Sequence, residues 1–260
     1  MKEYTTQKIR NIALIGHGSS GKTTLTEAML FYSKAIGRRG SVADGTTVTD
    51  FDEEEIRRHI SLNTAMAPVE WKDCKINVLD TPGYTDFIGE VRCALRVADM
   101  ALLVIDAAAG VEVGTELTWG YASDEKISRA VLINKMDREN ANFDRALASL
   151  EKSFDAQFRP LMLPVGAQAA FAGVVNLLDM QAYMGPKCEL AAIPADLADQ
   201  VEEFRVPAHP TNVHLPLIDD FARALVEGRA PQFDGHDAIQ AQRIMEGCYR
   251  SSQAGSVLPV

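Results

Sequence analysis

The sequence predicts an α/β sandwich of three layers with a mostly parallel sheet, and three observations lead to this class. Short, nearly continuous apolar runs recur between Ile9 and about Phe154. Segments of helix length with one apolar face alternate with these runs. Each run is too uniformly apolar for a strand with one wet face, so it suits a parallel strand that is covered on both sides. Helices that alternate with such strands place the chain in this class.

The individual elements follow from the same pattern. The predicted parallel strands are Ile12–Gly16, Lys75–Asp80, Met100–Asp106 and Arg129–Asn134. The predicted helices are Lys22–Ala35, Asp86–Val97, Val113–Asp124 and Asn142–Phe154. Residues Ala65–Trp71 are predicted to pair antiparallel with Lys75–Asp80 across a turn at Lys72 and Asp73. Residues 37–60 have no period, so we expect a long functional or mobile loop there, with its charged run Asp52–Arg58 solvated and partly helical.

Length and composition limit the function classes. A chain of 260 residues allows one large domain, or one domain and a fragment. With 47% hydrophobic and 24% charged residues, the composition excludes collagen-like, disordered and disulfide-scaffold classes. A formal charge of -10 argues against coating nucleic acid or an anionic membrane by bulk electrostatics. The start has no apolar signal core, and Asp106 ends the most apolar run well short of a membrane span. We therefore expect a cytoplasmic protein with no membrane partner and no direct sequence-specific nucleic-acid binding.

The cysteines and tryptophans point to packing roles. The cysteines are far apart and form no CxxC pair, so we expect reduced, packed thiols rather than a zinc site or a disulfide framework; they are Cys74, Cys93, Cys188 and Cys248. Trp71 and Trp119 are expected to be core or half-buried anchors, because no basic and aromatic residues surround them in the pattern of a base-stacking surface.

The segment GHGSSGKTT, Gly16–Thr24, follows a predicted strand and precedes a predicted helix. It fits the pattern GxxxxGK plus Ser or Thr, whose backbone N–H groups and helix N-terminus bind phosphates. Lys22 would reach the β- and γ-phosphates, and the Thr23 hydroxyl would bind Mg²⁺. A chance glycine-rich turn is the alternative. The candidate nucleotide-binding residues are His17, Gly18, Ser19, Ser20, Gly21, Lys22, Thr23 and Thr24.

The segment DTPG, Asp80–Gly83, ends another predicted strand. A carboxylate at that position can hold Mg²⁺ through water beside a phosphate loop, and Gly83 can donate its N–H to a γ-phosphate. The alternative is an ordinary turn at the end of a strand, since Asp, Pro and Gly all favour turns. The phosphate loop upstream favours the functional interpretation.

The segment NKMD, Asn134–Asp137, follows the strand Arg129–Asn134. Here Asp137 would accept two hydrogen bonds from guanine, Asn134 would bond the other edge of the purine, and Lys135 would lie over the ring. Adenine offers neither donor and would leave the Asp137 carboxylate unpaired. The alternative is a helix N-cap, for which Asn and Asp are common. Its place downstream of both phosphate motifs favours guanine recognition.

These motifs together resemble the translational GTPases, most closely elongation factor G and its bacterial paralogues, from about Lys8 to Arg205. The resemblance implies GTP or GDP and Mg²⁺ as ligands and a ribosome as a partner. It implies that residues 37–60 are switch I and that switch II begins at Gly83, two segments that order around γ-phosphate and metal. Residues Leu163–Tyr183 are similar to the start of the subdomain that this family inserts into its G domain.

Two positions depart from the family pattern. Ser61 stands where these proteins usually have the Thr of switch I that binds Mg²⁺, and Thr64 is a competing candidate. The predicted metal ligands are therefore Thr23, Ser61 and Asp80. Tyr84 follows DTPG where most translation factors have a His that orients the attacking water. A phenol is a poor base but can position water, so we expect weak hydrolysis by Lys22, Gly83 and Tyr84; a packing role for Tyr84 is the alternative.

The C-terminal part reads differently. Residues His209–Val260 resemble the end of a Gfo/Idh/MocA-type oxidoreductase, without a dinucleotide-binding glycine motif. We expect a G domain at 1–159 that lacks its last strand, a partial inserted subdomain at 160–205, and a helical tail at 206–260 in a chimeric chain. His209, His214 and His236 are expected to be loop or packing residues. The alternative functions are a guanine-nucleotide-binding remnant without catalysis and, less favoured, a fragment of an NAD(P)-dependent oxidoreductase.

Overall fold

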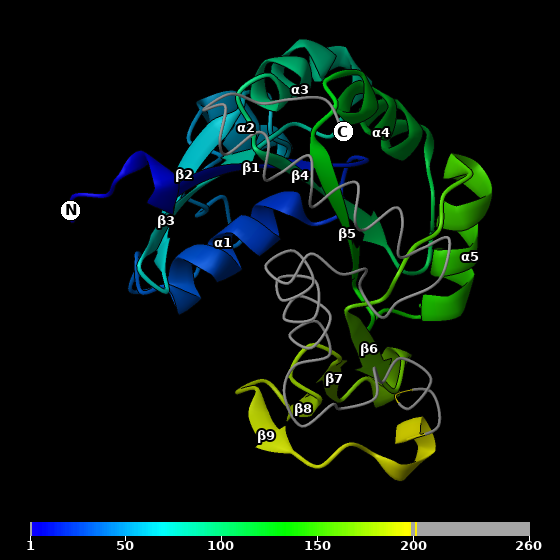
Figure 1. Cartoon of the computed structure of the whole chain (residues 1–260). Helices are drawn as coiled ribbons and strands as arrows, with labels where there is room; N and C mark the ends of the chain where they lie inside the picture. The colour runs from blue at the N-terminus through cyan, green and yellow to red at the C-terminus, as the bar shows by residue number, and fades with distance from the viewer. Residues whose placement is uncertain (1, 199–200, 202–260) are drawn as a thin grey trace, which may run out of the picture. The chain divides into compact units, whose positions relative to one another are not determined.

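The computed structural model describes residues 2–198 and residue 201, and a five-stranded sheet organises the first part of the chain. Its strand order is β2-β3-β1-β4-β5 (Figure 1). The strands are β1 (Ile9–Ile15), β2 (Ala65–Trp71), β3 (Cys74–Asp80), β4 (Met100–Asp106) and β5 (Ser128–Asn134). All neighbouring pairs are parallel except β2 and β3. The predicted α/β class with a mostly parallel sheet is confirmed.

The helices agree with the predicted ones in place; the helix Val113–Asp124 has the predicted bounds, and the others differ at one or both ends. They are α1 (Lys22–Tyr32), α2 (Glu53–Arg58), α3 (Ile88–Leu95), α4 (Val113–Asp124) and α5 (Phe143–Phe154), with short 3-10 helices η1 (Thr6–Lys8), η2 (Thr85–Phe87), η3 (Gln168–Ala170) and η4 (Ala195–Leu197). Helix α1 stops before Ala35 because Lys34 has a φ of 63° and Ala35 and Ile36 donate their N–H groups back to Leu30. This turn lets Ile36 pack against the core.

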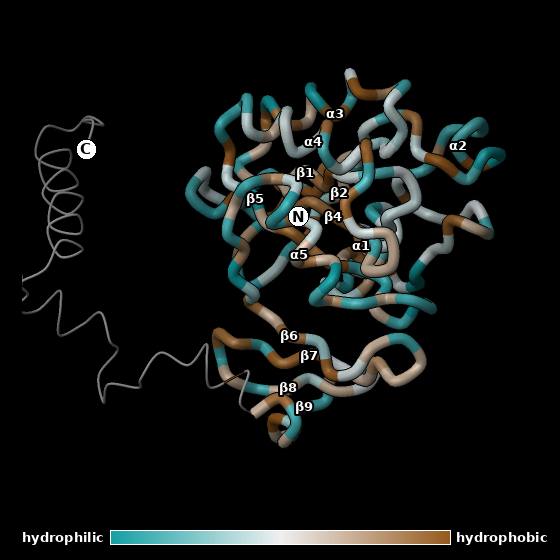
Figure 2. The backbone as a smooth tube through the Cα atoms, turned by 90° about the vertical axis from the view of Figure 1, so that its right-hand side faces the viewer, coloured by the Kyte–Doolittle hydropathy of each residue, from teal (hydrophilic) through white to brown (hydrophobic). Residues whose placement is uncertain are grey.

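The two faces of the large sheet bury separate apolar clusters. Ala13 and Ile15 of β1 face one cluster, to which α3, α4 and α5 contribute, and Leu14 between them faces the other, which α1 covers. This alternation follows from the two-residue period of a strand. In Figure 2 the strands of this sheet run through the interior as apolar segments. Burial on both faces explains why the predicted strands are apolar throughout.

The hairpin between β2 and β3 turns at the predicted residues. Lys72 and Asp73 both have positive φ values, 44° and 62°, which is the backbone of a two-residue type I′ turn. Trp71 and Cys74 pair directly beside it. The predicted antiparallel pairing is therefore confirmed, with the turn at these two residues.

A second, antiparallel sheet follows α5, and the sequence analysis predicted none of its strands. It contains β6 (Met162–Val165), β7 (Gly173–Asn176), β8 (Gln181–Met184) and β9 (Glu189–Ala191) in that order. These strands have three or four residues, which is too short for a period to be recognised. The loop after β6 contacts the first part of the chain, where Gln168 donates its N–H to the Met136 carbonyl at 2.7 Å.

Several packing predictions need correction. Cys93 and Cys188 are exposed free thiols and not packed ones, because each lies on the outer side of its segment, while Cys74 is half-buried. Trp71 is 51% exposed at the end of its hairpin, whereas Trp119 packs against the core as predicted. Cys248, the tail helices and the tail histidines lie outside the described residues.

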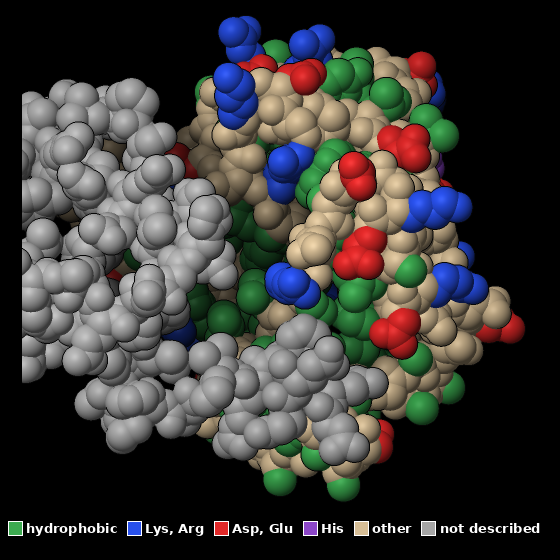
Figure 3. Space-filling model, turned by 45° about the vertical axis from the view of Figure 1, so that its right-hand side comes forward, with side chains coloured by type: hydrophobic (Ala, Val, Ile, Leu, Met, Phe, Trp, Pro, Cys, Tyr) green, Lys and Arg blue, Asp and Glu red, His purple; other side chains and the backbone are tan. Residues whose placement is uncertain are grey.

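Two properties of the described surface bear on partners. Acidic and basic side chains are interspersed on the face seen in Figure 3. None of the helices within residues 2–198 has the length and apolar character needed to cross a membrane.

Candidate functional site

The candidate site lies at one edge of the large sheet, where the parallel strands have their carboxyl ends. Gly16 follows β1, and Asp80, Asp106 and Asn134 are the last residues of β3, β4 and β5. The order β3-β1-β4-β5 places these ends next to one another. Ligands of open α/β sheets bind in the crevice beyond such ends. The fold therefore brings the three predicted motifs, far apart in the sequence, to one place.

The phosphate loop, Gly16–Thr24, depends on two glycines. A Cβ at Gly16 would lie 2.4 Å from the Val104 carbonyl oxygen, and one at Gly21 would lie 2.4 Å from Asn134 Nδ2. Both residues also have positive φ values, 134° and 101°. Glycine alone fits these positions, so the loop can approach β4 and β5 closely.

Lys22 is buried inside this loop. Its Nζ donates to the Gly16 carbonyl at 3.1 Å and the His17 carbonyl at 2.9 Å. Burial lowers the pKa of Lys22 to about 8, although Asp80 opposes this change. A buried ammonium whose hydrogen-bond partners among the described residues are neutral carbonyls is poorly compensated, and an anionic ligand would compensate it.

Other residues of the loop keep polar atoms without protein partners. Ser20 Oγ and His17 Nδ1 are buried and have no hydrogen-bond partner among the described residues. His17 Nε2 lies 3.5 Å from Glu112 Oε1. Gly18, Ser19 and Thr24 line the pocket that the loop borders. The sequence predicted nucleotide contacts for all eight loop residues; six of them line the pocket, whereas His17 and Ser20 do not.

The predicted metal ligands gather beside Thr23. Its Oγ1 lies 3.1 Å from Ser61 Oγ, and Asp80 Oδ2 accepts a hydrogen bond from Thr49 at 2.8 Å. Asp80 Oδ1 is buried without a partner among the described residues. Burial raises the pKa of Asp80 to about 6, against hydrogen bonds from Thr49 and Thr23. A buried carboxylate with an unused oxygen beside two hydroxyls is a donor set that suits Mg²⁺.

The competing candidate in switch I lies elsewhere. Thr64 donates its N–H to Glu90 Oε2 at 2.9 Å and its hydroxyl to the Glu90 carbonyl at 3.3 Å. It is not among the pocket-lining residues, and Ser61 is. Of the two hydroxyls that the sequence left open, the geometry therefore favours Ser61.

Sequence reasoning missed two residues of this site. Asp50 Oδ1 accepts the Ser61 hydroxyl at 2.7 Å, and Asp50 lines the pocket together with His59. His59 ends α2 with a left-handed φ of 55° and bonds the Val42 carbonyl through Nδ1 at 2.8 Å. The region holds several acids within six residues, so the sequence offered no signal that separates Asp50 from its neighbours.

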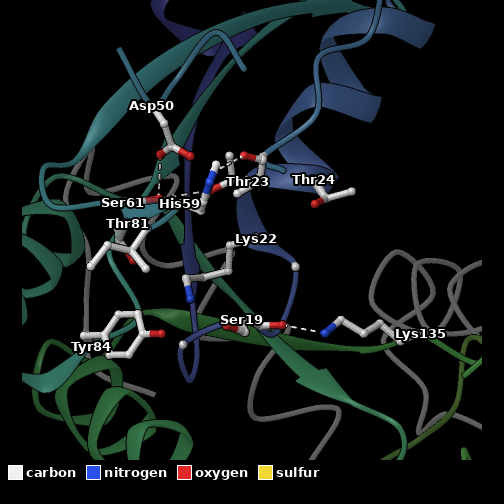
Figure 4. A pocket seen from close by; sticks show the side chains of 15 residues that line it. Ser19, Lys22, Thr23, Thr24, Asp50, His59, Ser61, Thr81, Tyr84 and Lys135 are labelled. Carbon is white, nitrogen blue, oxygen red and sulfur yellow. Dashed lines mark hydrogen bonds between the residues drawn. The ribbon is translucent and has the colours of Figure 1, made fainter. Parts of the chain in front are cut away.

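Gly83 and Tyr84 close the pocket opposite switch I. A Cβ at Gly83 would lie 2.5 Å from Lys22 Nζ and 2.7 Å from Gly18 Cα, so DTPG packs directly on the phosphate loop. The Tyr84 ring lies against Gly18 and is 40% exposed. Figure 4 shows Lys22 between Tyr84 on one side and Asp50 and Ser61 on the other. The cavity among these groups has a volume of about 240 Å³.

The guanine motif, Asn134–Asp137, is tied to the phosphate loop. Asn134 Nδ2 donates to the Ser20 carbonyl at 2.9 Å, and Lys135 Nζ donates to the Ser19 carbonyl at 2.6 Å (Figure 4 shows the second bond). Asp137 is exposed, and within residues 2–198 its carboxylate has no hydrogen-bond partner. The arrangement can hold a phosphate chain at one end and offer a free carboxylate to a base at the other.

Comparisons with known proteins show the family of the chain. The model of the elongation factor Tu GTP-binding domain matches residues 7–225, twenty residues past the point where the sequence analysis placed the end of the resemblance. Elongation factor G of Granulibacter bethesdensis is 42% identical over 211 residues, which are 79% of this chain and 30% of that protein. A solved protein from Thermus thermophilus superposes with a TM-score of 0.72 at 33% identity, over 90% of this chain and 35% of that one.

The chain thus spans about a third of the length of these relatives. These matches confirm the predicted resemblance to the elongation factor G group. They neither support nor contradict the predicted chimeric tail. Since the family model covers most of the chain and the three motifs meet in one site, the chain belongs to the elongation factor Tu GTP-binding domain family.

Proposed function

We propose that this protein binds GTP and GDP with Mg²⁺ in the cytoplasm and hydrolyses GTP slowly. The observation that carries the proposal is the link between the two ends of the site. Asn134 and Lys135 hydrogen-bond the carbonyls of the phosphate loop, while Asp137 keeps a free carboxylate at the base end. The groups that would bind the phosphates and the carboxylate that would bind the base therefore lie on two segments that hydrogen-bond each other.

The residues divide the work as follows. Lys22 and the N–H groups of the phosphate loop bind the β- and γ-phosphates, and Lys22 gains the anionic partner that its buried ammonium lacks. Thr23, Ser61 and Asp80 would hold Mg²⁺, with Asp50 supporting Ser61. When bound, Mg²⁺ supplies neutralisation of the phosphate charge. Gly83 offers its N–H to the γ-phosphate, and Tyr84 hydrogen-bonds and orients the attacking water.

One feature supports slow rather than rapid hydrolysis. Tyr84 stands where a His would orient the attacking water, and a phenol orients water but accepts a proton poorly near neutral pH. The same feature also favours the second candidate function, a guanine-nucleotide-binding domain that does not catalyse hydrolysis.

Base recognition is tested with Asp137→Asn. We expect the variant to bind GDP and GTP at least tenfold more weakly, because a hydrogen bond to a charged group is worth about 1.5–3 kcal/mol. ATP binding should be weak in both proteins and change little. Isothermal calorimetry with GDP, GTP and ATP and Mg²⁺ measures this, with Asp144→Asn on the exposed side of α5 as a control. An equal loss for GTP and ATP would defeat the assignment.

Hydrolysis is tested by single-turnover release of phosphate from bound GTP, with and without ribosomes. We expect slow release that Tyr84→Phe reduces further, since the ring stays and the hydroxyl that orients water is lost. A Lys22→Ala variant should not bind GTP and serves as the blank. Saturated GTP binding without phosphate release under either condition would favour the non-catalytic function.

The partners and the domain division remain part of this proposal. A ribosome is the partner by relation to elongation factor G, although the chain spans only 30% of that protein. We propose a G domain at 1–159, a partial inserted subdomain at 160–205 that contains the second sheet, and a tail at 206–260. Co-sedimentation with ribosomes in the presence of a non-hydrolysable GTP analogue tests the partner, and no pelleting above background would exclude it.

A further inference from the structure

Asp106, the last residue of β4, is a buried acid that the proposed function does not use. Its side chain is 6% exposed. Oδ1 accepts the Ala108 N–H at 2.9 Å, and Oδ2 accepts hydrogen bonds from Lys135 Nζ at 3.3 Å and Arg138 Nη1 at 2.7 Å. Both cations come from the segment that begins with the guanine motif. One carboxylate on β4 therefore holds the loop that follows β5.

Lys135 joins this carboxylate to the phosphate loop. The same ammonium donates to the Ser19 carbonyl at 2.6 Å. Lys135 and Ser19 both have left-handed backbones, with φ values of 58° and 59°, which cost energy in residues other than glycine. Such conformations persist where the surrounding contacts hold them. The three-way contact of Asp106, Lys135 and Ser19 provides such contacts at the place where the base motif meets the phosphate loop.

The charge of Asp106 suits this role. Burial alone would raise the pKa of Asp106, but the Ala108 N–H and the cations of Lys135 and Arg138 together lower it below its ordinary value. The carboxylate is therefore ionised at neutral pH. The Arg138 side chain is 59% exposed and that of Lys135 is 30% exposed. Solvent screens the Arg138 pair more strongly, so the pair with Lys135 matters more for geometry although its distance is longer.

We propose that Asp106 is a positioning residue for base recognition, whose carboxylate holds the Lys135 side chain across the purine site between β4 and the phosphate loop. The inference rests on the proposed binding of guanine nucleotides. Without the Asp106 charge, the Ser19 carbonyl is the one strong acceptor that the described residues leave to the Lys135 ammonium. Its side chain then gains rotamer freedom that nucleotide binding has to remove.

The test is a double-mutant cycle on GDP affinity, measured by calorimetry with Mg²⁺ in the full chain. Asp106→Asn and Lys135→Met should each weaken GDP binding by about 10- to 100-fold, the range of a charge-assisted hydrogen bond. If Asp106 acts through Lys135, adding Asp106→Asn to Lys135→Met should weaken binding by no more than about twofold further. The control is Asp99→Asn, because Asp99 accepts the Asn11 N–H near the opposite end of β4. This control should bind GDP as the wild type does.

Three results overturn the inference. The first is an unchanged GDP affinity of folded Asp106→Asn. The second is a loss of GDP affinity in the double variant that equals the product of the two single losses. The third applies if Asp106→Asn fails to fold, when ¹³C NMR follows the titration of the Asp106 carboxyl in the wild type and in Lys135→Met. The pKa of this carboxyl should be higher in Lys135→Met, and an unchanged pKa overturns the pairing. Wild-type protein that binds no guanine nucleotide defeats the proposed function itself, whereas wild-type binding with no effect of Asp106 defeats only this inference.

Discussion

Asp80, which we propose as a metal ligand, is buried at a cost to the stability of the metal-free protein. One of its oxygens is buried without a partner among the described residues, and burial raises its pKa to about 6. In the unfolded chain a carboxyl group of this kind titrates near 4. Between about pH 4 and pH 6 the folded protein therefore binds the proton more readily than the unfolded chain does. The stability of the metal-free protein should fall as the pH rises through this window and level off above it.

Asp80→Asn removes this charge. We expect the variant to raise the free energy of unfolding of the metal-free protein by about 1–3 kcal/mol at pH 7.5 and by much less at pH 4.5. The same change should weaken Mg²⁺-dependent binding of GTP. Urea unfolding in EDTA at both pH values measures the first effect, with Asp144→Asn as the exposed control. A gain in stability of equal size at both pH values would speak against the buried charge as its cause.

Two buried carboxylates, Glu27 of α1 and Glu55 within switch I, hold the backbone of switch I and of the residues that directly follow it. Glu27 of α1 is fully buried, and its two oxygens accept the N–H groups of Gly40 at 2.7 Å and Val48 at 2.5 Å. Glu55 is also buried and accepts the N–H groups of Leu62 and Asn63 at 2.9 and 3.0 Å. Hydrogen bonds to charged acceptors are stronger than those between neutral groups, so these carboxylates stabilise the conformation of a segment that has little regular structure.

Glu27→Gln tests whether the Glu27 carboxylate stabilises the conformation of switch I. The amide can accept one of the two N–H groups but turns a donor toward the other, which leaves a buried donor unsatisfied at a cost of about 1–3 kcal/mol. We expect faster hydrogen exchange in residues 40–48 and unchanged exchange in α5. Mass spectrometry of exchanged peptides measures both, and Glu116→Gln on the exposed side of α4 is the control. Unaltered exchange in residues 40–48 would show that Glu27 does not hold the loop.

The segment between β6 and β7 packs on the end of the large sheet in a small apolar cluster beside the guanine motif. Its buried members are Ala107, Met136 and Ala141, and Ala167 and Phe171 from the loop after β6 pack against them. Met136 lies inside the NKMD motif itself and is 7% exposed. The segment between β6 and β7 therefore supports the loop that we propose to bind the base, and stability and base affinity should change together at this point.

Met136→Ala opens a cavity in this cluster. We expect a loss of about 2–5 kcal/mol in the free energy of unfolding and weaker GDP binding, since the loop that carries Asp137 loses its packing. Met66→Ala, at a position that is 61% exposed, should change either quantity by less than about 0.5 kcal/mol. Urea unfolding and GDP calorimetry on the same preparations measure the effects. Lost stability with unchanged GDP affinity would show that this cluster does not contribute to base binding.

Much of the large sheet could be predicted because each of its strands carries its own local signal. The strand Met100–Asp106 and the helix Val113–Asp124 have the predicted bounds, since burial on both faces or on one face leaves a clear pattern. The second sheet lacks such a pattern in strands of three or four residues. The three ligand motifs were likewise recognisable, because each combines glycines, a cation or a carboxylate at fixed spacing at the end of a strand.

The sequence by itself determined the phosphate loop, the DTPG turn, the guanine motif and the order of strands and helices that carries them, because these depend on residues close together in the chain. Only the tertiary structure decided that Ser61 rather than Thr64 stands beside Thr23, and that Asp50 and Asp106 belong to the same region. Asn134 and Ser20 are 114 residues apart and share a hydrogen bond. Such contacts arise when parallel strands bring their carboxyl ends to one edge, which no local pattern records.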